Sequence, residues 1–222
     1  RKSLSLRKTK TDRVDAKTIA TMLLSDVDLK SYTDIAYHNE ELKSLTRFRD
    51  SLVRQRSRHL VELTNILDKV FPEFKPFFGG RFSVTALHIL SNYSSPEKIS
   101  NMNSKSYEAL RKLSRGRFST VDFAKLKQLA KNTVGSTEDY LLQEMQIVLE
   151  LYSKLDSMID ETERSIKECV SVMNPPMLTV PGIGIESAAV MLAEFGDFSK
   201  FDNPSQMLSF AGIEPGYFQS GT

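Results

Sequence analysis

The segment from Leu141 to Met173 constrains the fold more than any other part of the sequence. Its apolar residues recur in alternating steps of four and three, the heptad pattern of a helix that packs along its length against another helix. The seam consists of Leu141, Met145, Val148, Tyr152, Leu155, Ile159, Thr162, Ile166, Cys169 and Met173. Such a helix would be about 50 Å long at ~1.5 Å per residue. The chain therefore needs a second long helix as its partner.

The segment from about His38 to Val70 is the candidate partner helix. Two apolar stretches lie on either side of a polar run at residues 54–59, and Pro72 and Pro76 end the helix. We expect these two helices to form a coiled-coil connector over residues 37–173. The pattern leaves open whether they pack within one chain, between chains, or both.

Shorter helices are expected elsewhere in the chain. Pro96 marks a helix start, Gly116 marks a helix end, and a further helix is expected at about residues 121–132. After Met173, a short linker leads into a glycine-punctuated region that runs to the end of the sequence. Because hardly any segment reads as a convincing strand, the predicted fold class is mainly α. The expected domains span residues 1–36, 37–173 and 174–222.

The composition excludes several classes of protein. No apolar run reaches the roughly 18 residues that a membrane span needs, and the first residues lack the apolar core of a signal peptide. Cys169 is the only cysteine, which excludes a disulfide framework and fits a reducing cytoplasm. The three histidines lie far apart in the sequence. His88 falls in an apolar helix, where we expect a core histidine rather than a metal ligand.

Charge is distributed unevenly along the chain, although the formal net charge is only +2. Residues 43–58 carry six basic groups against one acid, whereas residues 138–168 carry nine acids against three basic groups. Either the basic segment faces a nucleic acid, or the basic and the acidic helix pair with each other. In the first case, six engaged cations would give a log–log salt slope of about −5. The candidate phosphate contacts are Lys8, Lys10, Arg13, Arg47, Arg54, Arg56 and Arg58.

Two carboxylates stand three residues apart in Thr-Asp-Arg-Val-Asp-Ala, residues 11–16. If a helix starts here, Asp12 and Asp15 share one face and repel each other unless a cation or proton intervenes. Mg²⁺, which prefers oxygen ligands, would relieve this repulsion, although a metal site needs further acids. The same residues also suit an ordinary helix start, with Asp12 as N-cap and Asp15 in the first turn.

Residues 178–189 have the pattern of a helix-hairpin-helix. A helix ends, Pro-Gly-Ile-Gly makes a tight turn, and a helix rich in small residues begins at about Glu186. Gly182 and Gly184 let the backbone come close to a phosphate, and the free N–H groups at the start of the next helix, at Ile183, Gly184 and Ile185, are expected to point outward. Gly182, Ile183 and Gly184 are therefore candidate contacts to a nucleic-acid backbone, made without reading its sequence. Glu186 stands where many such hairpins have a basic residue, which weakens an anion site.

A third candidate lies in Gln219-Ser220-Gly221. A serine in a glycine-rich turn is usually a turn residue, and no base is visible beside Ser220. The residues alone therefore do not identify a nucleophile.

Taken in order, these motifs resemble the insertion-sequence one-hundred-and-ten family of bacterial transposases. Thr-Asp-Arg-Val-Asp-Ala-Lys followed by Ile-Ala-Thr-Met-Leu is similar to the end of the family's N-terminal nuclease domain. Val-Pro-Gly-Ile-Gly-Ile-Glu-Ser-Ala, Ala-Glu-Phe-Gly-Asp-Phe-Ser-Lys-Phe, Ala-Gly-Ile-Glu-Pro and Gln-Ser-Gly are similar to its C-terminal transposase domain. The middle of the chain matches in helical character only, as the family's coiled-coil connector.

The resemblance implies a transposase that cuts and rejoins DNA. Residues 1–36 would end a RuvC-like, ribonuclease H-like domain whose four acids (DEDD) hold Mg²⁺. Asp12 and Asp15 match the last two acids, and the first Asp and the Glu would lie upstream of Arg1. Ser220 matches the family's serine, which attacks a DNA phosphate and forms a phosphoserine link. A guide RNA encoded by the element would select the DNA, and a homo-oligomer, a dimer or larger, would join the acids and the serine.

Two other functions stay open: a non-catalytic helix-hairpin-helix module on a coiled-coil stalk that binds nucleic acid, and a purely structural dimerisation protein. The sequence begins with Arg1 and stops at Gln-Ser-Gly-Thr without a closing element, so we expect a fragment that cannot transpose DNA by itself. The expected location is the bacterial cytoplasm, at the nucleoid.

Overall fold

The computed structural model describes residues 12–24 and 37–213. The chain divides into two compact units, Arg1–Tyr37 and His38–Thr222. Within the described ranges every regular element is a helix, which confirms the prediction of a mainly α chain. No helix in these ranges combines the length and the apolar character that crossing a bilayer requires.

The first unit contains helix α1, Asp12–Leu24. The helix begins at Asp12 and includes Asp15, so a helix start in this segment is confirmed for the backbone, whereas the N-cap role expected of Asp12 stays a prediction. The side chains of Arg13 and Lys17 are exposed. The apolar side chain of Leu24 is exposed as well, at 86%.

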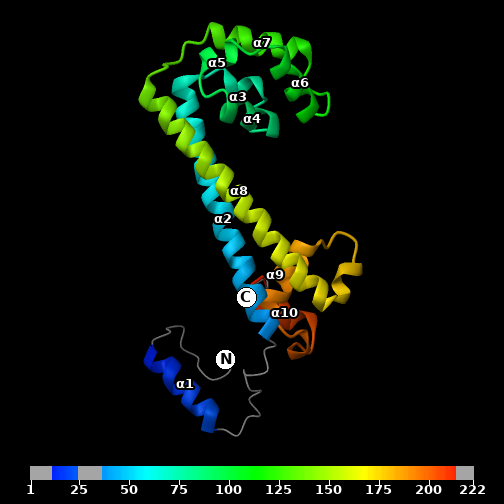
Figure 1. Cartoon of the computed structure of the whole chain (residues 1–222). Coiled ribbons are helices and arrows are strands. Elements are labelled where there is room, and N and C mark those ends of the chain that lie inside the picture. The colour runs from blue at the N-terminus through cyan, green and yellow to red at the C-terminus, as the bar shows by residue number, and fades with distance from the viewer. Residues whose placement is uncertain (1–11, 25–36, 214–222) are drawn as a thin grey trace, which may run out of the picture. The chain divides into compact units, whose positions relative to one another are not determined.

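Two long helices, α2 (Tyr37–Val70) and α8 (Asp139–Met173), run side by side as the stalk of the second unit (Figure 1). They are antiparallel, because Arg49 pairs with Glu163 whereas Arg56, about two turns later, pairs with Asp156. The predicted partner helix is therefore confirmed, and the two helices pack within one chain.

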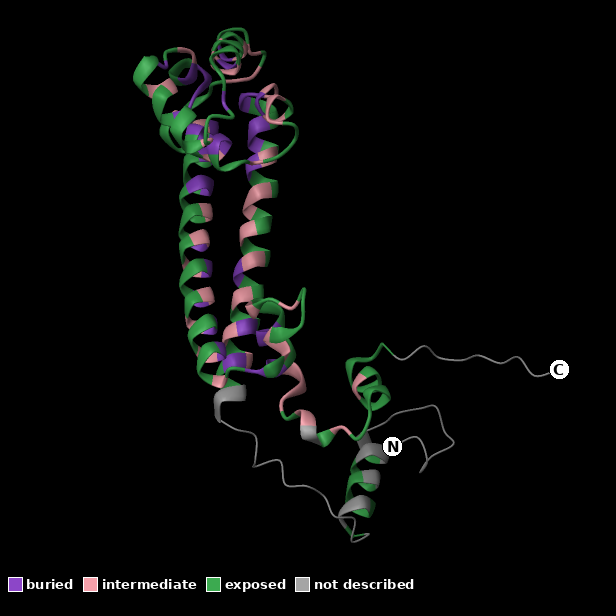
Figure 2. Cartoon of the chain, turned by 90° about the vertical axis from the view of Figure 1, so that its right-hand side faces the viewer, coloured by how far each residue is buried: buried purple, intermediate pink, exposed green. Residues whose placement is uncertain are grey.

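The predicted seam of α8 is the face that packs. Seven of its ten positions are buried: Leu141, Met145, Val148, Leu155, Ile159, Thr162 and Ile166. Tyr152, Cys169 and Met173 are half-buried. Figure 2 shows that buried residues gather at both ends of the stalk and thin out along its middle. There, Leu52 of α2 packs against Leu155 and Ile159 in a small core of its own.

Five short helices follow α2 and form what we call the head, residues 71–138. They are α3 (Phe74–Phe77), α4 (Val84–Asn92), α5 (Pro96–Ser100), α6 (Ser104–Leu113) and α7 (Thr120–Lys131). Four of them begin at polar N-caps that accept a backbone hydrogen bond: Ser83, Ser95, Asn103 and Ser119. Pro96 and Gly116 mark a helix start and a helix end as predicted.

One prediction for the head is wrong. His88 is exposed, not part of the core. The buried residues of α4 are Thr85, Ala86, Ile89 and Leu90, which occupy one face of the helix. His88 falls on the other face, so the apolar character of the helix as a whole concealed its position.

The head is fixed to the stalk where α2 ends. The loop after α7 is held by Glu73, whose carboxylate accepts hydrogen bonds from Thr133 Oγ1 at 2.7 Å and from the N–H of Val134 at 3.2 Å. Gly135 lies directly against the last turn of α2, and a Cβ atom there would overlap the carbonyl of Val70. The N–H of Ser136 donates to the carbonyl of Lys69 at 2.8 Å, which satisfies one of the free carbonyls at the helix end.

The C-terminal region packs at the opposite end of the stalk (Figure 1). It contains two 3-10 helices, η3 (Pro176–Thr179) and η4 (Phe198–Lys200), and two α-helices, α9 (Ile185–Phe195) and α10 (Pro204–Ala211). Buried residues of α9 join Leu42 of α2 and Ile166 and Val170 of α8 in one core. Beside it, the ring of Phe195 contacts the rings of Phe198, Phe201 and Phe210, which connects α10 to α9.

Candidate nucleic-acid interface

The basic residues of α2 lie against acids rather than in open solvent. Arg49 Nε donates to Oε1 of Glu163 at 2.7 Å, and both side chains are 33% exposed. Arg56 pairs with Asp156 of the same acidic helix. The alternative in which the basic and acidic helices pair with each other is therefore realised at two positions along the stalk.

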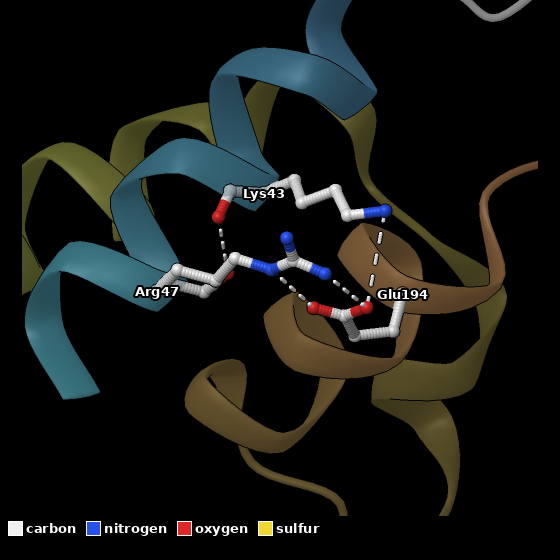
Figure 3. Close-up of polar contacts among 4 residues, drawn as sticks. Lys43, Arg47 and Glu194 are labelled. Carbon is white, nitrogen blue, oxygen red and sulfur yellow. Dashed lines mark hydrogen bonds and ion pairs between the residues drawn. The ribbon is translucent and has the colours of Figure 1, made fainter. Parts of the chain in front are cut away.

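A third acidic partner comes from α9. Arg47 donates from Nε to Oε1 of Glu194 at 3.0 Å and from Nη2 to Oε2 at 3.1 Å, and Lys43 Nζ lies 3.9 Å from the same carboxylate (Figure 3). The hydrogen bond with Glu194 raises the pKa of Arg47. The hydrogen bond from Arg47, supported by the charges of Arg47 and Lys43, outweighs burial and lowers the pKa of Glu194. This bidentate ion pair joins α9 to the first part of α2.

Two predicted contacts on α2 stay more accessible. Arg54 pairs with Asp50 at 2.8 Å on its own helix, and its side chain is 73% exposed. Arg58 is exposed and forms no ion pair with any of the described residues. Of the α2 residues that the sequence singles out, Arg54 and Arg58 can therefore reach a phosphate without first leaving an acid on another helix.

The glycine-rich turn before α9 differs in one respect from the expectation. The N–H of Ile183 donates to the carbonyl of Val180 at 3.1 Å, so it closes a turn and is not free. Pro181 and Gly182 occupy the middle of this turn, and Gly182 has a φ of 92°, which is the pattern of a type II turn. The expected free N–H at Ile183 is therefore wrong, because the turn itself uses that group.

The start of α9 carries acidic neighbours. Gly184 is its N-cap and makes no side-chain capping bond. A carboxylate oxygen of Glu186 lies 3.6 Å from the place that a Cβ atom at Gly184 would take. A cavity of about 470 Å³ beside this turn is lined by Asp160, Glu163 and Glu186 together with Arg164 and Lys167. The weakening effect expected of Glu186 is thus reinforced by two acids of α8. The first helical element of the hairpin, η3, is a single 3-10 turn.

Several predicted site residues lie outside the described set. Asp12 and Asp15 are placed in α1 by their backbone only, and Lys8, Lys10 and Ser220 lie outside the described residues altogether. Arg13 is exposed. Among the described residues, no group of three or more His, Cys, Asp or Glu side chains has metal-binding geometry. The magnesium site and the serine nucleophile therefore stay predictions.

The sequence analysis missed Glu194 as a partner of the basic helix. It appears there only within the motif Ala-Glu-Phe-Gly-Asp-Phe-Ser-Lys-Phe, where nothing in the local pattern connects it to Arg47, 147 residues earlier. One signal in the sequence could have found it. The small residues of α9, such as Ala188 and Ala189, predict that this helix packs closely against another element, and Glu194 follows them in the same helix.

Comparisons with known proteins agree with the motifs at both ends of the chain. A sequence model of the DEDD transposases of IS110 matches residues 1–72, and a second, described as Transposase IS116/IS110/IS902 family, matches residues 175–222. A protein of Streptomyces coelicolor, the insertion element IS110 uncharacterized 43.6 kDa protein, is 26% identical over 96% of this chain and 54% of its own length. The chain thus spans about half the length of that relative. No solved structure matches. The chain belongs to the IS110 family of insertion-element transposases.

Proposed function

We propose that this chain is the part of a DNA transposase that carries two carboxylates and the serine of one composite catalytic centre. The observation that supports this most directly is the order of the two transposase matches. Residues 1–72 include Asp12 and Asp15, and residues 175–222 include Ser220. The three proposed domains are the end of a RuvC-like domain at residues 1–36, a coiled-coil connector at 37–173 and a transposase domain with a helix-hairpin-helix at 174–222.

The proposed reaction is a transesterification. The Oγ atom of Ser220 attacks a DNA phosphate and loses its proton, a bond from phosphorus to Oγ forms, and the bond from phosphorus to one deoxyribose oxygen breaks. That oxygen takes up a proton and leaves. Rejoining reverses the step on a new strand end, so one ester replaces another and no outside energy source is needed.

The carboxylates of Asp12 and Asp15 are suited to hold Mg²⁺ together with further acids of the complete enzyme. When bound, the ion would stabilise negative charge on the phosphate and favour the ionised hydroxyl. The role of the two residues themselves is to supply oxygen ligands from one turn of α1, whose backbone places them three residues apart.

The stalk supports a shared site by its topology. Because α2 and α8 are antiparallel, the beginning of α2 and the whole of α9 lie at the same end of the stalk, joined by Arg47 and Glu194. The segment that follows the N-terminal unit and the segment that leads to Ser220 thus start from one place. In the complete enzyme, we propose that a homo-oligomer built on the coiled coil unites the carboxylates and Ser220 on one phosphate, with a guide RNA from the element selecting the DNA.

The test is excision and strand transfer by the full-length enzyme, with Ser220→Ala and Asp15→Asn as variants. Each should abolish both reactions, and Ser220→Ala should also remove the covalent protein–DNA adduct. Ser205→Ala, at an exposed position of α10, is the matched control and should retain activity. Wild-type excision by Ser220→Ala would overturn the nucleophile assignment. The 222-residue chain alone should cut no DNA in Mg²⁺.

A non-catalytic nucleic-acid-binding module is the second candidate. The observation that favours it is the turn at Gly182 with its positive φ, followed by a helix whose N-cap, Gly184, makes no side-chain bond. This function predicts nucleic-acid binding that is lost on substituting the turn glycines, together with full excision in the Ser220→Ala variant.

A further inference from the structure

The head carries the positive charge of this chain. Residues 71–138 contain eleven Lys and Arg residues against five Asp and Glu residues, whereas the whole chain has 30 against 28. Outside the head, acids therefore outnumber bases. The basic residues of the head lie on four of its helices, α3, α5, α6 and α7, and in the loops between them.

These basic residues are not neutralised by neighbours. Among the described residues, no ion pair within 4.0 Å is found for a basic side chain of the head, whereas six such pairs lie on the stalk or between the stalk and α9. Two acids of the head are engaged otherwise. Glu73 accepts hydrogen bonds from Thr133 and Val134, and Asp122 closes the capping box of α7. The head thus presents an excess of basic groups; Lys125 is one that does lie near a carboxylate, since its charge contributes to lowering the pKa of Asp122.

Two of these arginines line a groove. The groove has a volume of about 630 Å³, and its walls include Arg115, Arg117, Phe78, Phe118 and Val84. No Asp or Glu lines it. Two further cavities of the described region both contain acids, namely Asp160, Glu163 and Glu186 in one and Asp50, Glu186 and Glu194 in the other. Of these three, the groove in the head is therefore the one suited to an anion.

The turn that presents the arginines is well fixed. Helix α6 ends in two successive left-handed residues, Arg115 with φ 54° and Gly116 with φ 79°, and the N–H of Gly116 donates to the carbonyl of Arg111 at 2.8 Å. The N–H of Phe118 donates to Ser114 Oγ at 3.0 Å. The ring of Phe118 is 6% exposed and stacks on Phe78 at 6.3 Å and 11°. Both guanidinium groups consequently extend from an ordered turn, which lowers the entropic cost of binding.

We propose that this groove binds the phosphodiester backbone of a nucleic acid, as a contact site at the far end of the stalk from the C-terminal region. A planar guanidinium matches the paired oxygens of a phosphate, and two of them on one turn can hold consecutive phosphates of a strand. Because Phe78 and Phe118 pack on each other instead of facing outward, the groove offers no platform for stacking bases. The contact is one of charge and shape, not of sequence. It rests on the proposed function only in taking nucleic acid as the partner.

The test measures binding of the full chain to a labelled 30-base-pair DNA duplex and to an RNA duplex of the same sequence, by fluorescence anisotropy over a salt series. Arg115→Asn/Arg117→Gln should raise Kd about tenfold or more and flatten the log–log salt slope by about 1.8, since each lost phosphate contact contributes ~0.9. Asparagine is chosen at Arg115 because it tolerates the left-handed conformation. Lys105→Gln/Lys131→Gln, which removes the same charge from exposed positions of the head outside the groove, is the control.

Equal changes in Kd and slope for the two double variants would overturn the proposal, since they would reflect general charge alone. If circular dichroism shows that Arg115→Asn/Arg117→Gln is unfolded, the single variant Arg117→Gln tests the proposal instead. It should flatten the log–log salt slope by about 0.9. Tighter binding of wild type to the RNA duplex would assign the groove to an RNA, and tighter binding to the DNA duplex would assign it to the element or its target. Ser220→Ala should leave both affinities unchanged, so failure of the groove and failure of the proposed chemistry are separate results.

Discussion

The stalk and the head both carry clusters of basic residues, but only those of the stalk are matched by acids. On α2, Lys43, Arg47, Arg49, Arg54 and Arg56 each lie within ion-pair distance of a carboxylate. In the head, none of eleven basic residues does so among the described residues. The two regions use the same residue types for different purposes: the stalk to hold helices in register, the head to present a positive surface.

The difference matters because a charge that is already paired adds little to the long-range field. A phosphate that approaches Arg49 or Arg56 also approaches Glu163 or Asp156, and must displace them to form a contact. Unpaired groups around a groove attract a polyanion at a distance and release its counterions on contact. A slope of about −5 from the basic segment of α2 alone is therefore too steep an expectation for this structure.

The largest effect should follow from separating the head from the stalk. In Gly135→Ala, the new methyl group would meet the backbone carbonyl of Val70, and the backbone at Ser136 would have to give up its bond to Lys69. We expect a loss of about 2–4 kcal/mol in the free energy of unfolding, measured by urea denaturation. Thr137→Ala, two residues later at an exposed position, should change it by less than ~0.5 kcal/mol. Wild-type stability in Gly135→Ala would show that the junction is loose.

Removing the acids of the stalk should make its arginines behave like those of the head. Asp156→Asn/Glu163→Gln keeps the shape of both side chains and deletes both charges opposite Arg56 and Arg49. We expect a Kd for duplex DNA about five times lower at low salt and a salt slope steeper by up to about 1.8. Glu144→Gln/Glu150→Gln, at exposed positions of α8 with no ion pair among the described residues, should change both quantities less. Equal changes would mean that stalk and head do not differ in the proposed way.

The sequence predicts the elements of the stalk well because their signal is local. A seam such as Leu141, Met145 and Val148 repeats within one helix, and the burial of all three follows from that repeat. Contacts between residues distant in sequence are not predictable in the same way. Pairing of Arg49 with Glu163 depends on the register of two antiparallel helices, which is set by the length of the chain between them and by how the head folds.

In the candidate site, too, local features were predictable from the sequence and contacts between distant residues were not. The turn at Gly182 and the start of α9 were predictable from Pro-Gly-Ile-Gly, since these residue types suit few other conformations. The hydrogen bond from the N–H of Ile183 to the carbonyl of Val180 depends on the turn type, which the residue types alone do not fix. The acids Asp160 and Glu163 near the turn come from α8, which is distant in the sequence. The groove at Arg115 and Arg117 joins the end of α6 to the start of α4, two elements whose proximity has no signature in the sequence.

Exchanging the charges of Arg49 and Glu163 tests whether their ion pair stabilises the stalk. Arg49→Glu places two carboxylates together with Glu163 and should lower the free energy of unfolding by about 1 kcal/mol. The double variant Arg49→Glu/Glu163→Arg restores opposite charges and should recover most of this loss, as measured by urea denaturation. If the double variant loses as much as the sum of the two single variants, the pair contributes no coupling and the stalk is held by its apolar seam alone.

The smallest effect concerns the pair that ties α9 to the stalk. The hydrogen bond from Arg47 lowers the pKa of Glu194 from 4.5, so its carboxylate contributes stability that is fully present above pH 4.5 and is lost as the pH falls through the lowered value. Glu194→Gln should therefore reduce Tm by about 2 °C at neutral pH, because an exposed pair contributes little, and the difference from wild type should disappear in acid. Glu150→Gln, an exposed acid of α8, should show no such convergence. If Glu194→Gln instead raised Tm at neutral pH, burial and not Arg47 would dominate the environment of this carboxylate.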